Sequence, residues 1–225
     1  MNKPNLPVWK QAINDSYVKF KLLCNDQNKV KNEMGFAMQY FENNTYLQTC
    51  DPNSIINAIL NIARVKSTLN PVMRLAYLIP RKKKCVLEFS YMGLVSLLKT
   101  NGCIKSISAH IVFTDDEFSY DIGANHINHK PKYAQTEAEH KNRKMIGCYS
   151  RAVLPDNSIL YEFMPKWEID KVKNSSEGSG SKYSAWNTWE DEMIKKSVIK
   201  RHFKMLIGQN PNFALQTNLT NKIKI

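Results

Sequence analysis

Apolar residues recur at helical spacing through the first part of the chain. Steps of three or four residues separate them, which is the period of a helix that buries one face. The pattern predicts helices between residues 8 and 48. The residues that form these stripes are Val8, Ile13, Tyr17 and Phe20, followed by Val30, Met34, Ala37, Met38 and Phe41.

A new helix is expected after residue 50. Asp51 suits the N-cap of a helix, and Pro52 suits its first helical position because proline has no N–H to leave unpaired. Apolar residues then form a buried side as far as Ala63, and we expect this helix to end near Lys66. The sequence Leu69-Asn70-Pro71 predicts the break that follows it.

The apolar period changes after residue 71, which predicts strands. Leu75–Ile79 and Cys85–Phe89 are short apolar runs, and the segment between them carries four consecutive cations, so it reads as the tip of a β-hairpin. A helix is expected at 91–98 and a short one at 165–172. Further strands are expected at 104–113, 118–122, 145–153 and 159–164, with a turn at 115–116 between the first two and a polar loop at 123–144.

The segment from Trp186 to Leu206 predicts a long helix. Lys196, Lys200 and Lys204 fall at i, i+4 and i+8 and form one basic face, which we call the lysine ridge. On a continuous helix, Trp186 and Trp189 would extend the same face. Acidic residues fill the first turns and lysines the later ones, as the helix dipole favours.

These elements predict an α+β fold in which antiparallel β-hairpins pack with helices. We expect an N-terminal helical region at 1–68 that serves packing and oligomerisation, an α+β core at 69–208, and a short C-terminal tail at 209–225. The Gly- and Ser-rich stretch at 173–183 has no apolar period and is expected to be mobile.

The net charge narrows the choice of partner. The chain has 225 residues and a formal charge of +12, and such self-repulsion indicates a polyanionic partner, most commonly nucleic acid. The N-terminus has no apolar run typical of a signal peptide, and no stretch approaches the about 20 apolar residues of a membrane span. We therefore expect a cytoplasmic protein without a membrane partner.

Cysteines and histidines do not indicate a metal site. The cysteines, Cys24, Cys50, Cys85, Cys103 and Cys148, are far apart and form no C-x-x-C pair, as is typical of reduced thiols. The closest histidine pair, His126 and His129, has no cysteine nearby, so no metal ligand is predicted.

Several short segments, in a fixed order, resemble the phage RecT family of single-strand annealing proteins, which pair complementary DNA strands without ATP. The pieces that carry the resemblance are Tyr46-Leu47, Asp51-Pro52-x-Ser54, Leu69-Asn70-Pro71, Ala76-Tyr77-Leu78-Ile79-Pro80, Tyr91-x-Gly93-Leu94 with Leu97, and Tyr183-Ser184-x-Trp186-x-x-Trp189-x-Asp191-Glu192-Met193-x-x-Lys196 with Ile199-Lys200-Arg201 and Lys204.

The resemblance implies a fold related to that of the eukaryotic annealing recombinases, and a DNA groove built from the hairpins and the last helix. It implies a homo-oligomer, a ring or a helical filament, that binds single-stranded DNA and the annealed duplex in a bacterial host. It also implies a partner 5′–3′ exonuclease and a host single-strand-binding protein. RecT-like proteins engage these partners through a longer C-terminal region, so we expect weaker engagement by this tail.

Cationic and aromatic residues are the candidate DNA contacts, because Lys and Arg bind phosphates without reading sequence and aromatic rings stack on bases. No ATP site is predicted, and Mg²⁺ is expected only to modulate DNA binding. The predicted contacts are Lys196, Lys200, Arg201 and Lys204 on the last helix; Arg81, Lys82, Lys83 and Lys84 on the hairpin; Lys130, Lys132, Lys141, Arg143 and Lys144 in the loop; and Tyr91, Trp186 and Trp189. For the two tryptophans, packing in the core or between protomers is at least as common a role, and a tyrosine that opens a helix is more often structural.

Two other functions remain open from the residues alone. Asp115, Asp116, Glu117 and Asp121 cluster in the sequence as the carboxylates of a two-metal nuclease would. Against this, aspartate is also the expected residue at a hairpin turn. The basic charge alone is equally typical of an RNA-binding protein that does not anneal strands.

Overall fold

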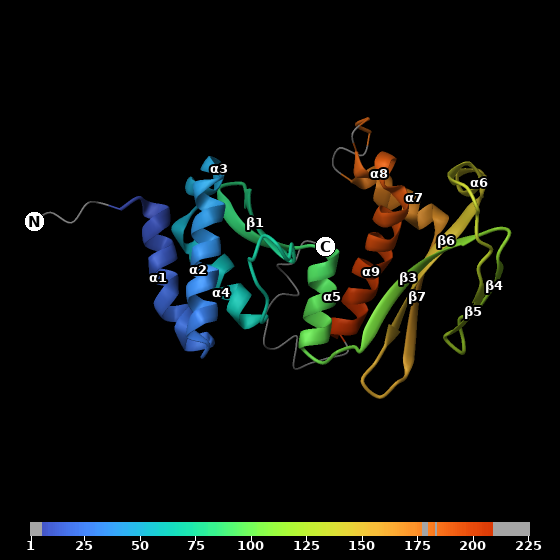
Figure 1. Ribbon diagram of the computed structural model, residues 1–225, viewed down its shortest axis with the longest axis horizontal. Helices are drawn as coiled ribbons and strands as arrows, with labels where there is room; N and C mark the ends of the chain where they lie inside the picture. Colours follow the sequence, from blue (N-terminus) through green and yellow to red (C-terminus); the bar gives the residue numbers. More distant parts are fainter. Residues whose placement is uncertain (1–5, 177–179, 183, 209–225) are drawn as a thin grey trace, which may run out of the picture. The chain divides into compact units, whose positions relative to one another are not determined.

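The computed structural model describes residues 6–176, 180–182 and 184–208, and it divides into two compact units (Figure 1). The described part of the first unit is residues 6–101, and the second unit begins at Gly102. The mixed helices and antiparallel strands confirm the predicted α+β class. The predicted tail at 209–225 lies outside the described residues, as do residues 177–179 and 183 of the Gly- and Ser-rich stretch.

The first unit packs helices beside one β-hairpin. Its elements are α1 (Val8–Leu23), α2 (Gln27–Glu42), α3 (Thr45–Gln48), α4 (Pro52–Arg64), β1 (Ala76–Arg81), β2 (Lys84–Phe89) and α5 (Tyr91–Thr100). The apolar side of α4 is buried and faces α1 and β2. The predicted cap is confirmed, since the Asp51 carboxylate accepts a hydrogen bond from the Ser54 N–H at 2.8 Å.

The hairpin belongs with the N-terminal helices, although a boundary near residue 68 was predicted. The N–H of Asp51 donates to the carbonyl of Lys83 at 2.8 Å. The Cys85 N–H donates to the Ser54 hydroxyl at 2.9 Å. These bonds join the start of α4 to the tip of the hairpin, so the contacts within the chain divide at residue 101 instead.

The second unit is built on a three-stranded antiparallel sheet in the order β3-β6-β7. Its elements are β3 (Ser106–Phe113), β4 (Glu117–Asp121), β5 (His126–Lys130), α6 (Glu137–Asn142), β6 (Met145–Val153), β7 (Ile159–Pro165), α7 (Lys166–Ser175), α8 (Ala185–Thr188) and α9 (Glu190–Gly208). Helices α7 and α9 contact the sheet, and the core between them contains Cys148, Met164, Ile169 and Ile194.

Two predictions about this unit were wrong. The chain does not return from β3 along β4, because β4 pairs with β5, and β6 lies beside β3. Arg143, two residues before the start of β6, donates a hydrogen bond to Asp116 in the turn after β3, so this contact joins the adjacent ends of the two strands. The predicted polar loop at 123–144 therefore contains a strand and a helix.

The predicted helix from Trp186 to Leu206 is interrupted. Trp189 has φ −138° and ψ 49°, which is not helical, and it separates α8 from α9. Among the described residues, no helix is long and apolar enough to cross a lipid bilayer.

Helix α9 is anchored to the sheet by buried polar groups. The imidazole Nδ1 of His202 lies 2.5 Å from the hydroxyl of Ser150 on β6, and both residues are fully buried. Burial lowers the pKa of His202 to about 4, because a charged imidazole would lose its hydration there. The ring is therefore neutral in the folded protein near pH 7.

We expect stability to fall with pH across the His202 titration. The unfolded chain takes up a proton at this ring below about pH 6.5, whereas the folded protein does so only near pH 4, so unfolding is favoured as the pH drops between these values. The loss should be on the order of 3 kcal/mol. Chemical denaturation of the wild type and of His202→Gln, which keeps an acceptor for Ser150 but does not titrate, should show a steeper pH slope in the wild type. Equal slopes would contradict this account.

Candidate nucleic-acid interface

The lysine ridge lies on the outward edge of α9. Ile194, Val198 and Phe203 on the same helix are buried. Lys196 and Lys200 are half-buried and Lys204 is exposed. Each step of four residues turns the helix by about 40° and advances it by about 6 Å, so the three ammonium groups follow one another along a single edge.

Arg201, which was predicted to contact DNA, is engaged within the unit. Its guanidinium pairs with Glu162 at 2.6 Å and also with Glu168. Glu162 lies on β7 and Glu168 on α7, so Arg201 joins α9 to two neighbouring elements. Burial raises the pKa of Glu162, and the charge of Arg201 opposes that rise. The arginine thus serves to place the lysines beside it.

The two tryptophans at the start of the ridge do not share a face. Trp186 is 2% exposed and packs in the core with Cys148 and Met164, so its indole is not available to a base. The prediction of a DNA contact at Trp186 is therefore corrected. Trp189 is 69% exposed, so its indole does not pack in the core.

The hairpin tip concentrates charge in an unusual backbone conformation. Lys82 and Lys83 form the turn between β1 and β2, and both have positive φ, 47° and 61°. Two consecutive positive φ angles are typical of a type I′ turn, which strongly prefers Asn-Gly. Lysine in the left-handed region costs about 1–2 kcal/mol per residue. Arg81 pairs with Glu88 at 2.6 Å.

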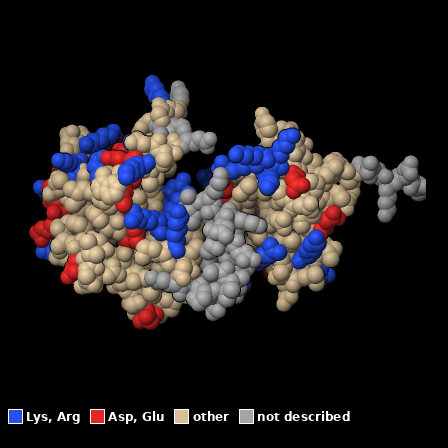
Figure 2. All heavy atoms as spheres, turned by 180° about the vertical axis from the view of Figure 1, so that it is seen from behind, with Lys and Arg blue, Asp and Glu red and all other residues tan. Residues whose placement is uncertain are grey.

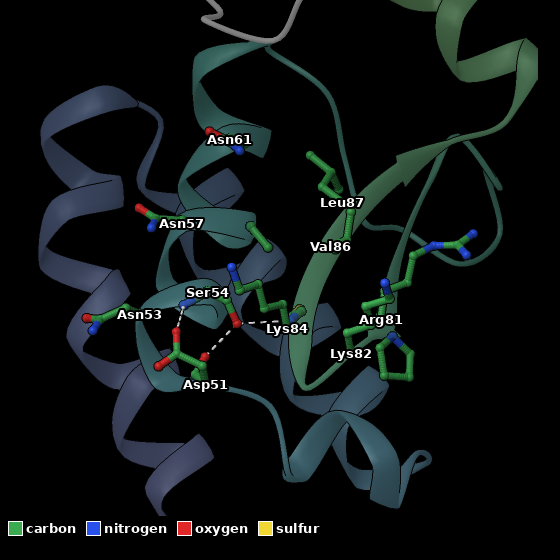
Figure 3. Close-up of a pocket in the computed structure, with 13 residues that line it drawn as sticks. Asp51, Asn53, Ser54, Asn57, Asn61, Arg81, Lys82, Lys84, Val86 and Leu87 are labelled. Atoms are coloured by element: carbon green, nitrogen blue, oxygen red, sulfur yellow. Dashed lines mark hydrogen bonds between the residues drawn. The ribbon is translucent and has the colours of Figure 1, made fainter. Parts of the chain in front are cut away.

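A groove of about 780 Å³ lies between this hairpin and α4 (Figure 3). Lys84 reaches from β2 toward α4, whereas Arg81 extends away from it. Apolar side chains of β2, including Val86 and Leu87, line the hairpin side of the groove. Along α4 the groove is lined by amides at i, i+4 and i+8, namely Asn53, Asn57 and Asn61. Sequence reasoning did not single out these asparagines, although their helical spacing could have revealed them.

The cations of the predicted loop divide into exposed and structural ones. Lys132 and Lys144 are exposed, and exposed Lys130 and Lys141 form surface ion pairs with Glu117 and Glu137. Arg143 is only 10% exposed, and its guanidinium pairs with Asp115 and Asp116 and lies 4.0 Å from the centroid of the Phe113 ring. Arg143 therefore stabilises the turn rather than facing a ligand.

The same turn accounts for the carboxylates that suggested a nuclease. Asp116 is 1% exposed and accepts hydrogen bonds from the backbone N–H groups of Lys132 and Phe113, and its carboxylate also meets His129 and Arg143. Burial would raise the pKa of Asp116, but these hydrogen bonds outweigh it and lower the pKa to about 2. Both oxygens of Asp116 are therefore engaged by groups of the protein itself. No group of three His, Cys, Asp or Glu side chains in the described part of the chain is placed to hold a metal ion.

Tyr91 and Trp167 complete the candidate residues. Tyr91 is the half-buried first residue of α5, whose N-cap is Ser90. Trp167, on α7, is 56% exposed and was not singled out from the sequence, because nothing in its local pattern distinguishes it from a core residue. Figure 2 shows lysine and arginine side chains grouped on the surface of each unit taken by itself.

Comparison with known proteins gives consistent matches. A family model described as the RecT family matches residues 31–214. Protein RecT of Escherichia coli (strain K12) is 30% identical over 169 residues, an alignment that covers 71% of this chain and 60% of that protein. The chain thus spans about 60% of the length of this curated relative.

Proposed function

Because the chain belongs to the RecT family, we propose that it anneals complementary DNA strands without ATP during homologous recombination. The observation that carries the proposal is the family match over residues 31–214, which includes both the lysine ridge and the hairpin groove. Since the chain spans only part of its relative, the activity, the substrate and the partners all belong to this proposal.

The lysine ridge suits the physical task of annealing. A protein that pairs strands of any sequence must hold the backbone and leave the base edges open to a second strand. Phosphate contacts from lysine supply affinity that is independent of sequence. Lys196, Lys200 and Lys204 supply such contacts from a helix that is fixed on a sheet. Arg201 adds charge beside them while it holds α7.

The hairpin acts as a second clamp on the backbone. Lys82 and Lys83 occupy positions where Asn and Gly would be more stable, and strain of this kind commonly marks a functional site. Lys84 adds an ammonium group over the groove, and Arg81 adds charge on the outer side of the hairpin. The strained lysines therefore contribute charge at the expense of turn stability.

Other predicted residues take supporting roles. Lys130, Lys132 and Lys144 attract the strand to the second unit, and the hydroxyl of Tyr91 meets a phosphate near the first. The exposed indole of Trp189 stacks on a base at the start of the ridge. Arg143 and Trp186 stabilise the fold and do not contact the DNA in this proposal.

The chain works as an oligomer in this proposal. A small unit with a few phosphate contacts binds long DNA well only if copies repeat along the strand, so we propose rings or filaments that bind single strands and the annealed duplex. A phage or prophage 5′–3′ exonuclease supplies the single strand, and a host single-strand-binding protein competes for it. Mg²⁺ acts on the DNA rather than as a bound cofactor.

The annealing activity is tested with two complementary oligonucleotides labelled for fluorescence transfer. The wild type should accelerate their pairing with no nucleotide present. The double variant Lys196→Gln/Lys204→Gln should anneal more slowly and should flatten the plot of log affinity against log salt by roughly 0.7–0.9 for each lost contact. The loss should be the same for every DNA sequence, because phosphates carry no sequence information.

The control is Lys19→Gln/Lys31→Gln, which removes the same charge from exposed positions on α1 and α2. It should keep the wild-type salt slope. A ridge variant that behaves like this control would refute the ridge as the phosphate site. Strands shortened in the presence of Mg²⁺ would support the nuclease, and tighter binding to RNA without pairing would support an RNA-binding protein.

The hairpin clamp predicts opposite changes in stability and binding. The double variant Lys82→Asn/Lys83→Gly should stabilise the protein by about 1–2 kcal/mol, because it fits the type I′ turn. It should also weaken DNA binding and flatten the salt slope, because two cations are lost. Thermal melts and salt titrations measure both effects. A more stable variant with unchanged DNA affinity would show that the hairpin is only a soluble turn.

A further inference from the structure

Trp167 projects from the helical side of the second unit. It is the second residue of α7, and Ile169, which follows it by two positions, is buried on the core side. Residues two apart on an α-helix point about 200° from one another, so the indole faces outward. Tryptophan is highly buried on average, whereas this side chain is 56% exposed.

A cation accompanies the exposed indole. The ammonium of Lys171, one turn later on α7, lies 4.7 Å from the centroid of the ring. This cation–π contact holds a positive charge beside a flat apolar surface. A nucleotide offers the complementary pair of groups, a base with a π-face and a phosphate with negative charge. An exposed indole with a neighbouring ammonium group suits such a ligand.

The helix that carries the indole is joined to the helix that carries the lysine ridge. Glu168, the residue after Trp167, pairs with Arg201 of α9, which follows Lys200 directly. Helices α7 and α9 both contact β6 and β7, and they contact each other. The indole and the ridge therefore lie on neighbouring helices of the same unit.

A strand that is held for annealing leaves its bases open to a complement. Each such base is unpaired and keeps a π-face that an aromatic side chain can cover. An exposed indole on the unit that carries the lysine ridge offers such a contact.

We propose that Trp167 is a stacking site for an unpaired base of the strand that the lysine ridge holds, with Lys171 contacting the adjoining phosphate. This inference rests on the proposed function and adds a base contact to it. The ligand is a nucleotide of any base, since every base has a π-face. Trp167 thus limits how the held strand is displayed to its complement, without selecting its sequence.

The test compares an ordinary single-stranded oligonucleotide with one of equal length that carries abasic sites throughout. Fluorescence anisotropy measures the affinity of the wild type, Trp167→Ala and Trp167→Tyr for both. We expect Trp167→Ala to weaken binding of the ordinary strand by about 5- to 150-fold, which corresponds to about 1–3 kcal/mol, with the salt slope unchanged. Binding of the abasic strand should not change. Trp167→Tyr should recover most of the loss, because it keeps an aromatic face.

The matched control is Leu22→Ala, which removes an exposed apolar side chain from α1 and should leave both affinities unchanged. Equal weakening of both strands by Trp167→Ala, or no weakening, would overturn the stacking site while leaving the annealing function intact. A wild type that binds neither strand would overturn the proposed function itself. Loss of oligomers in sedimentation without DNA would identify Trp167 as an interface between copies, and would also overturn the inference.

Discussion

The packing of α9 on the β3-β6-β7 sheet is the constraint on which the candidate interface depends. Most of the helix circumference is buried, and the buried side includes His202 against Ser150 and Val198 in the core. That packing fixes the rotation of the helix and leaves one edge outward. A helix free to rotate would present its lysines in no fixed line, and affinity for a backbone would then include the entropic cost of ordering them. The neutral, buried His202 helps to hold this edge in place near pH 7.

The two kinds of cation have different roles in the second unit. Arg143 and Arg201 each bind two carboxylates, as suits a planar guanidinium with several donors. They connect elements that are far apart in the sequence. Lysines provide the outward charge, and their compact, strongly hydrated ammonium groups exchange partners easily. A protein that must hold a strand and later release a duplex benefits from such weak, repeated contacts.

Local signals predicted most of the elements, because caps and apolar periods act within a few residues. The cap at Asp51, the β1-β2 hairpin and the α4 helix follow from such signals. The pairing of β3 with β6 could not be predicted in this way, since β4, β5 and α6 lie between the two strands in the sequence. The break at Trp189 was missed because it lies before the ridge lysines. Their spacing is the same whether the helix begins at Trp186 or at Glu190. Trp186 is buried, whereas Trp189 and Trp167 are exposed. The local sequence pattern does not predict which tryptophan is buried, so these differences became visible only in the structure.

The central claim is that the lysine ridge and the hairpin tip each contact the phosphates of single-stranded DNA. Lysine acetylation followed by mass spectrometry, with and without single-stranded DNA, tests it at each residue in the unaltered protein. The account predicts that DNA protects Lys196, Lys204, Lys82 and Lys83, whereas exposed Lys31 on α2 reacts equally in both samples. Full reactivity of the ridge lysines at saturating DNA would contradict it.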